Sequence, residues 1–146
     1  MAEQEIARIE TEAEVNAYIQ NLKYALNNGA KVQFVAHRKV DSGRADRYTN
    51  WFTADKLFPK EDAIKAIKRE LLALTAGNYI KTVRDVRYPQ KSEMREFGKT
   101  YKGEGDVYIK IRVNLLGEYG ESTTFVMSFH FAERPFSSEM FPYRKG

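Results

Sequence analysis

The sequence predicts an α+β fold in which two helices pack on one face of a twisted, mainly antiparallel sheet. Apolar residues recur at the helical period in the first half of the chain, and they alternate with polar residues at the strand period in the second half. The 146 residues, 42% of them hydrophobic, suffice for one core, and no stretch rich in Pro, Gly or Ser marks a boundary. We therefore expect a single domain over residues 1–146, with an acidic N-terminal arm at 1–11 and an irregular C-terminal tail at 134–146.

The first helix is expected from about Glu12 to Asn28. Thr11 and Glu14 have the spacing of a capping box, and Gly29 stands where a left-handed C-terminal cap belongs. One apolar stripe follows the helical period: Val15, Tyr18, Leu22 and Leu26. This stripe is expected to face the core.

A second helix is expected to open at Pro59, which is favoured in a first helical turn, and to stop at Gly77-Asn78. The acidic Glu61 and Asp62 suit the positive end of the helix dipole. Apolar residues follow at spacings of three, four and three: Ile64, Ile67, Leu71 and Leu74.

Extended segments make up most of the remaining chain. Alternation or β-rich composition predicts strands at Lys31–Val40, Met94–Lys102, Gly105–Val113 and Thr123–Ala132, with a polar connection at Asp41–Asn50. Asn78–Val86 is expected to be a further short strand or an extended loop. In the last two strands one face is apolar and consists of Val107, Ile109, Ile111, Val113, Phe125, Met127, Phe129 and Phe131. The helices are expected to cover this face and to leave the other face open to water.

The open face of the last two strands carries reactive side chains. If Leu116–Ser122 is a hairpin loop centred on Tyr119, the pairing that keeps both apolar sets together places Tyr108 directly opposite His130. An imidazole, whose unperturbed pKa lies near 6.5, would then share a surface with a phenol and with Lys110. Such a surface could act on a phosphodiester.

The charge is uneven along the chain. The net charge is +4 and the isoelectric point is near 9.2. Five glutamates and one arginine give residues 1–14 a charge of −4, so the remainder carries +8. A polyanion is a reasonable partner for that remainder, although lysine and arginine also solvate many ordinary surfaces.

Several classes of protein are not expected from this composition. The chain has no Cys and only two His, so we expect neither a disulfide framework nor a metal site, and no cofactor. No stretch approaches the roughly 20 apolar residues that span a bilayer, and the first ten residues are unlike a signal peptide. A cytoplasmic protein with no membrane partner is expected.

Four short blocks resemble the MqsR family, in the family's order and between about Leu22 and Glu133. They are Asn78–Val83, Phe97–Tyr101, Val107–Val113 and Val126–His130. Members of this family are ribonuclease toxins of toxin–antitoxin pairs, similar in fold to the RelE toxins. The resemblance implies a RelE-like fold, an RNA substrate and a cognate antitoxin protein as partner, and it leaves open whether the ribosome takes part.

The resemblance also implies a catalytic site. The family's lysine in the first block, tyrosine in the third and cation in the last correspond here to Lys81, Tyr108 and His130. This chain departs from the family at His130, where the family usually has Lys, and at Gly98, where a Gln would contribute to the site. Lys99 or Lys102 are candidates to replace that Gln.

Metal-independent RNA cleavage needs a base for the 2′-hydroxyl proton, cations for the charge on phosphorus and an acid for the leaving 5′-oxygen. His130 is expected to be base or acid, Lys81 to stabilise the phosphate, and Tyr108 to orient the hydroxyl or donate to an oxygen. The residues expected to contact RNA are Lys99, Lys102, Lys110, Arg112 and His37. The products would be a 2′,3′-cyclic phosphate and a 5′-hydroxyl.

Two other kinds of protein fit the same pattern. One is a non-catalytic module that binds nucleic acid or protein through the open face, with His130 incidental to its function. The other is an accessory or inhibitor protein of a mobile element that binds another enzyme. A histidine on a strand is often only structural, and a Tyr-Lys-Arg face is often ordinary solvated surface.

Overall fold

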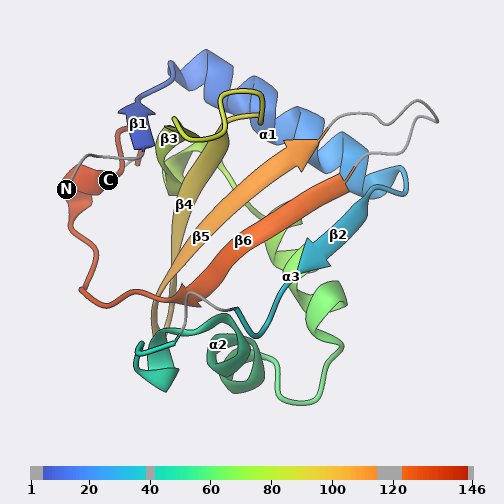
Figure 1. The fold of residues 1–146 in the computed structure, drawn as a ribbon, viewed down its shortest axis with the longest axis vertical. Coiled ribbons are helices and arrows are strands. Elements are labelled where there is room, and N and C mark those ends of the chain that lie inside the picture. Colours follow the sequence, from blue (N-terminus) through green and yellow to red (C-terminus); the bar gives the residue numbers. More distant parts are fainter. Residues whose placement is uncertain (1–4, 39–41, 115–122, 145–146) are drawn as a thin grey trace.

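The computed structural model describes residues 5–38, 42–114 and 123–144, which form an α+β domain around one six-stranded sheet. The elements are β1 (Glu5–Arg8), α1 (Glu12–Asn27), β2 (Lys31–Phe34), α2 (Asn50–Leu57), α3 (Ala63–Leu72), β3 (Tyr79–Asp85), β4 (Met94–Tyr101), β5 (Gly105–Asn114) and β6 (Thr123–Phe131). The strand order is β1-β3-β4-β5-β6-β2, and every pair is antiparallel except β2 with β6. Helices α1 and α3 lie behind this sheet in Figure 1, and α2 lies across the lower end of β6. The predicted fold class is confirmed.

The first helix confirms the capping pattern. The amide of Glu14 donates to Thr11 Oγ1 over 3.1 Å, and the amide of Thr11 donates to Glu14 Oε1 over 3.0 Å. Gly29 follows the helix with a φ of 88°, a conformation that costs glycine little. The local sequence therefore defines both ends of α1.

The second predicted helix begins later than expected. Pro59 lies before α3, whose N-cap is Asp62, since the Asp62 carboxylate accepts from the amide of Lys65 over 3.0 Å. The helix starts after Asp62 because its carboxylate satisfies a free amide of the first turn, and the side chain of Pro59 has no acceptor that could do so. The prediction also missed α2, an eight-residue helix capped by Thr49.

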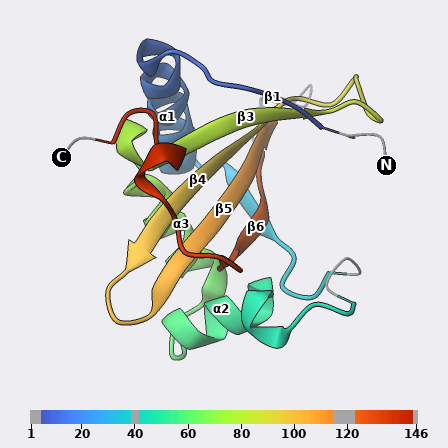
Figure 2. The same cartoon turned by 90° about the vertical axis from the view of Figure 1, so that its left-hand side faces the viewer.

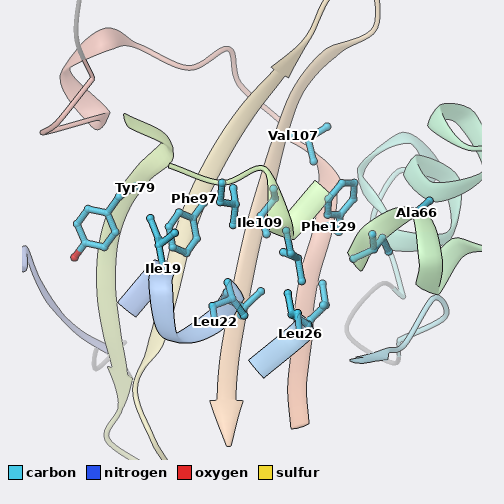
Figure 3. Close-up of a cluster of buried hydrophobic side chains, with 14 of the residues drawn as sticks. Ile19, Leu22, Leu26, Ala66, Tyr79, Phe97, Val107, Ile109 and Phe129 are labelled. Atoms are coloured by element: carbon cyan, nitrogen blue, oxygen red, sulfur yellow. The ribbon is translucent and has the colours of Figure 1, made fainter. Parts of the chain in front are cut away.

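The core lies between the sheet and the helices. Figure 3 shows apolar side chains of α1 and α3 meeting those of β3 to β6; the labelled members are Ile19, Leu22, Leu26, Ala66, Tyr79, Phe97, Val107, Ile109 and Phe129. Burial of each large aliphatic side chain contributes about 1.5–3 kcal/mol. This packing, rather than helix propensity, holds the helices on one face.

A β-bulge in β6 corrects the predicted apolar face. Lys110 pairs with Ser128 but Ile111 pairs with Val126, so Met127 is the extra residue. Beyond the bulge the alternation changes phase, and Thr124 and Val126 face the helices. The prediction that Phe125 and Met127 belong to the core face is therefore wrong.

The two ends of the described chain are more ordered than expected. Residues 5–8 of the predicted acidic arm form β1, which pairs with β3. The tail is irregular apart from a short 3₁₀ turn, but it packs firmly: Figure 2 shows it crossing β5 and β4 toward the start of β3, where Tyr143 stacks on Tyr79 with centroids 6.2 Å apart. The first end thus extends the sheet at one edge, and the tail covers part of its open face.

The strand predicted at Lys31–Val40 ends at Phe34, and the predicted loop Leu116–Ser122 lies outside the described residues. Among the described residues no helix has the length and apolar character needed to cross a membrane.

Candidate functional site

The open face of the sheet, opposite α1 and α3, carries the three predicted catalytic residues. On β5 and β6 the strand neighbours Val107 and Ile109, and Phe129 and Phe131, belong to the core, so alternation sends Tyr108 and His130 the other way. Lys81 pairs with Glu96, which lies across from Lys110 on that same face. Lys81 extends from β3, Tyr108 from β5 and His130 from β6. The structure therefore brings the three side chains to one face.

Tyr108 and His130 are direct cross-strand neighbours, as the pairing predicted. Their ring centroids lie 5.5 Å apart with a 40° tilt, and both side chains are half-buried. His130 Nδ1 lies 3.0 Å from the carbonyl oxygen of Phe131, which can only accept. When the ring is neutral, this contact places the proton on Nδ1 and the lone pair on Nε2.

Glu96 is the residue that sequence reasoning missed. The register places it between Lys81 on β3 and Lys110 on β5, and its side chain is buried. Burial raises the pKa of the Glu96 carboxyl, and the nearby Tyr108 phenol and the two lysines offset this only in part. Glu96 therefore holds a proton more readily than an ordinary glutamate. Alternation within Met94–Lys102 could have placed Glu96 on the open face, but only the register of three strands reveals its neighbours.

Tyr108 acts as a proton donor in this arrangement. Burial raises the pKa of the Tyr108 phenol well above its usual range, and the Glu96 carboxylate adds to this rise in its ionised form. The phenol therefore keeps its proton at neutral pH, and it can donate a hydrogen bond to an anion but cannot serve as a base.

Two cations near Tyr108 and Glu96, Lys110 and Arg38, are each bound to other groups. Lys110 Nζ lies 2.7 Å from Glu5 Oε2 and 4.0 Å from Glu96 Oε2. Arg38, which follows β2, donates from Nη1 to the carbonyl of Met127 over 2.6 Å and to Ser128 Oγ over 3.2 Å. The segment predicted as a separate acidic arm thus contributes Glu5 to the site.

The charges of Lys81 and Arg112 are not neutralised by a close carboxylate among the described residues. Within the described residues neither forms an ion pair within 4.0 Å, although the charge of Lys81 acts on Glu96. Arg112 donates from Nε to the carbonyl of Ser92 over 3.2 Å, a neutral acceptor. Two of the predicted cations therefore remain able to meet phosphate oxygens.

Three residues predicted to contact RNA do not join this group. Lys99 lies on the helix-covered face, where Nζ is 3.4 Å from Glu70 Oε1. Lys102 is exposed in the turn after β4, and His37 is exposed beyond β2 and stacks on Trp51 with centroids 5.8 Å apart. Lys99 does not replace the polar contact expected near Gly98, because alternation turns it away from that face.

Gly98 has a packing role. It pairs with Tyr108, and a Cβ at this position would lie 2.6 Å from Phe136 Cε2 and 2.9 Å from Phe141 Cζ. Only glycine lets the C-terminal tail approach so closely. The tail therefore covers the open face on this side of Tyr108.

No cluster of three or more His, Cys, Asp or Glu residues suited to a metal ion occurs in the described parts of the chain. Comparison with protein-family models, with curated proteins and with solved structures gives no match. The resemblance to the MqsR family and the RelE-like fold therefore remain predictions from the sequence blocks.

Proposed function

We propose that this protein is a metal-independent endoribonuclease, a toxin that cleaves RNA by attack of a 2′-hydroxyl on the adjacent phosphate. The observation that supports this proposal is the Tyr108–His130 pair, which lies beside the buried Glu96 and between cations on one open face. A proton acceptor, a proton donor and positive charge are the groups this reaction requires.

The roles follow from the protonation states. His130 Nε2 takes the proton of the 2′-hydroxyl, whose oxygen then bonds to phosphorus. Lys81 and the Tyr108 phenol stabilise the charge on the phosphate oxygens. As the P–O5′ bond breaks, the 5′-oxygen receives a proton from Tyr108, which Glu96 in turn supplies. The products are a 2′,3′-cyclic phosphate and a 5′-hydroxyl.

The partners follow from the same proposal. RNA is the substrate, a cognate antitoxin protein neutralises the toxin, and both are met in the cytoplasm. The sequence blocks Asn78–Val83 and Val126–His130 support this assignment, because they resemble the family's catalytic blocks.

The test combines purified protein with single-stranded RNA in EDTA and analyses the ends of the products. We expect a 2′,3′-cyclic phosphate from the wild type and a rate at least about 100-fold lower for His130→Ala and Lys81→Ala. His37→Ala is the matched control, because it removes an exposed imidazole outside the site. Induction in cells should arrest growth and degrade RNA with the wild type and with His37→Ala, but not with His130→Ala or Lys81→Ala.

A non-catalytic binding module is the second candidate. Lys81 and Arg112 favour it, because these cations form no ion pair among the described residues and can bind phosphate without a catalytic step. Unchanged RNA binding by His130→Ala, with no cyclic phosphate at any protein concentration, would support this second function and overturn the first.

A further inference from the structure

A cavity of about 350 Å³ opens on the same face of the sheet, beside Lys110. It lies between the turn that follows β3, the strands β4 to β6 and Arg38. We propose that it binds one nucleotide of single-stranded RNA, with the base against Tyr88 and the phosphate near Lys110 and Arg112. This subsite rests on the proposed function, since it would hold the nucleotide that flanks the cleaved phosphate.

The charge of the cavity favours an anion. Five basic side chains and two carboxylates line it, and both carboxylates are already paired. Arg87 binds both carboxylate oxygens of Asp85, over 3.0 and 2.8 Å, and Glu5 pairs with Lys110. Arg112 retains its charge, so the cavity carries excess positive charge for a phosphate.

The walls of the cavity suit a base. Tyr88 is 44% exposed, and its backbone is held by hydrogen bonds from its amide to Asp85 and from the amide of Lys91 to its carbonyl, over 3.1 and 3.0 Å. Met94 and Met127 supply apolar, polarisable surface at the floor. A flat aromatic ring next to such a floor matches the stacking platforms that bind single-stranded nucleic acids.

Two cations, Lys91 and Arg87, lie against the Tyr88 ring in the structure. Lys91 Nζ is 4.8 Å and Arg87 Cζ is 5.5 Å from its centroid. Both residues are exposed, and Lys91 forms no ion pair among the described residues. A base that stacks on Tyr88 would displace one of these side chains toward solvent, where it can meet a neighbouring phosphate.

The cavity meets the proposed catalytic group at Lys110, which neighbours Glu96. Lys110 lines the cavity, and its Nζ is 4.0 Å from Glu96. Ser128, which pairs with Lys110, lines it too. A volume of this size lies at the lower end of the range for small-ligand sites, which fits one nucleotide.

The experiment measures binding separately from cleavage. The probe is a fluorescein-labelled 2′-O-methyl RNA 10-mer of mixed sequence, which lacks the attacking hydroxyl and is followed by fluorescence anisotropy. We expect Tyr88→Ala to weaken binding about 10-fold or more, and Arg112→Gln to weaken it and lower the salt dependence by about one phosphate contact. Tyr24→Ala is the matched control, because this tyrosine is 72% exposed on α1, away from the cavity.

The outcomes separate the two proposals. Binding by Tyr88→Ala within about twofold of wild type, or no binding of the probe by the wild type, would overturn the subsite. If Tyr88→Ala binds normally while the wild type cleaves unmodified RNA, only the subsite is wrong. If Tyr88→Ala loses binding and the wild type yields no cyclic phosphate, the subsite stands and the cleavage proposal fails. Displacement of the probe by an acidic peptide, with Tyr88→Ala indistinguishable from wild type, would assign the cavity to a protein partner.

Discussion

Glu10 and Glu96 are equally buried, each 4% exposed, yet their pKa values move in opposite directions. Burial raises the pKa of both carboxyls. At Glu10 the hydrogen bonds and charges of Arg95, Thr82 and Arg8 outweigh burial, and the net shift is downward. At Glu96 burial prevails, and the net shift is upward.

The geometry explains the difference. Arg95 Nη2 lies 2.8 Å from Glu10 Oε1, and Thr82 Oγ1 donates to Glu10 Oε2 over 3.0 Å. Arg8 adds a contact of 3.0 Å. Lys110 Nζ, by contrast, stays 4.0 Å from Glu96 and is bound more closely by Glu5. A fully paired carboxylate joins elements of a fold, whereas a buried carboxyl with incomplete pairing is typical of functional sites.

The largest expected effect is on stability at Glu10. Glu10→Gln should lower the free energy of unfolding by about 3 kcal/mol, because it removes the closer counter-charge of the largely buried Arg95 guanidinium and leaves only Glu93, at 3.8 Å. Urea denaturation measures this loss. Glu96→Gln is the matched variant and should cost at most about 1 kcal/mol, since folding already favours the neutral carboxyl. Equal losses would show that the two sites do not differ as described.

The second expected effect is on the rate of RNA cleavage. Here the substitution of Glu96 should have the larger effect and the substitution of Glu10 the smaller one. Glu96→Gln should slow RNA cleavage about 100-fold, because an amide cannot supply a proton to Tyr108. Glu10→Gln should cleave at the wild-type rate per folded molecule, measured at a temperature where the variant remains folded. A wild-type rate for Glu96→Gln would remove Glu96 from the proposed mechanism.

The smallest effect is on the pH dependence of stability, and its sign differs between the two residues. The pKa of Glu10 is lowered in the folded protein, so its contribution is full above the ordinary value of 4.5 and is lost as the pH falls through the folded value. The pKa of Glu96 is raised, so its contribution is full below 4.5 and is lost as the pH rises through the folded value. Thermal unfolding from pH 3 to 8 should therefore show a weaker acid loss in Glu10→Gln than in wild type. In Glu96→Gln the decline in stability above pH 4.5 should be weaker than in wild type. The same pH profile of stability in both variants would contradict the comparison between Glu10 and Glu96.

Much of this arrangement follows from short-range patterns. The capping box at Thr11 and the alternation in β5 predict a helix and a strand, because hydrogen bonding and side-chain periodicity within a few residues determine them. The pairing of Tyr108 with His130 also follows, since the apolar sets of two adjacent strands must share one face.

Other features lie beyond such patterns. The bulge at Met127 changes the face of β6 without a sequence signal as strong as a glycine or proline. Asp62 rather than Pro59 begins α3, and the missed helix α2 is short, with two cap-forming residues, Thr49 and Asn50, at its start. The packing of Phe136 over Gly98 joins segments 38 residues apart, which no local pattern predicts.

The sequence alone determined the fold class, the boundaries of α1 and four strands, and the reactive pair on the open face, because these depend on periodicity and on one strand pairing. The tertiary structure alone decided which of the two buried carboxyls is closely paired, with its pKa lowered, and which has its pKa raised. The pKa of a carboxyl responds to nearby charges and to its removal from water. For Glu10 and Glu96 both depend on cations and burial that strands distant in the sequence provide.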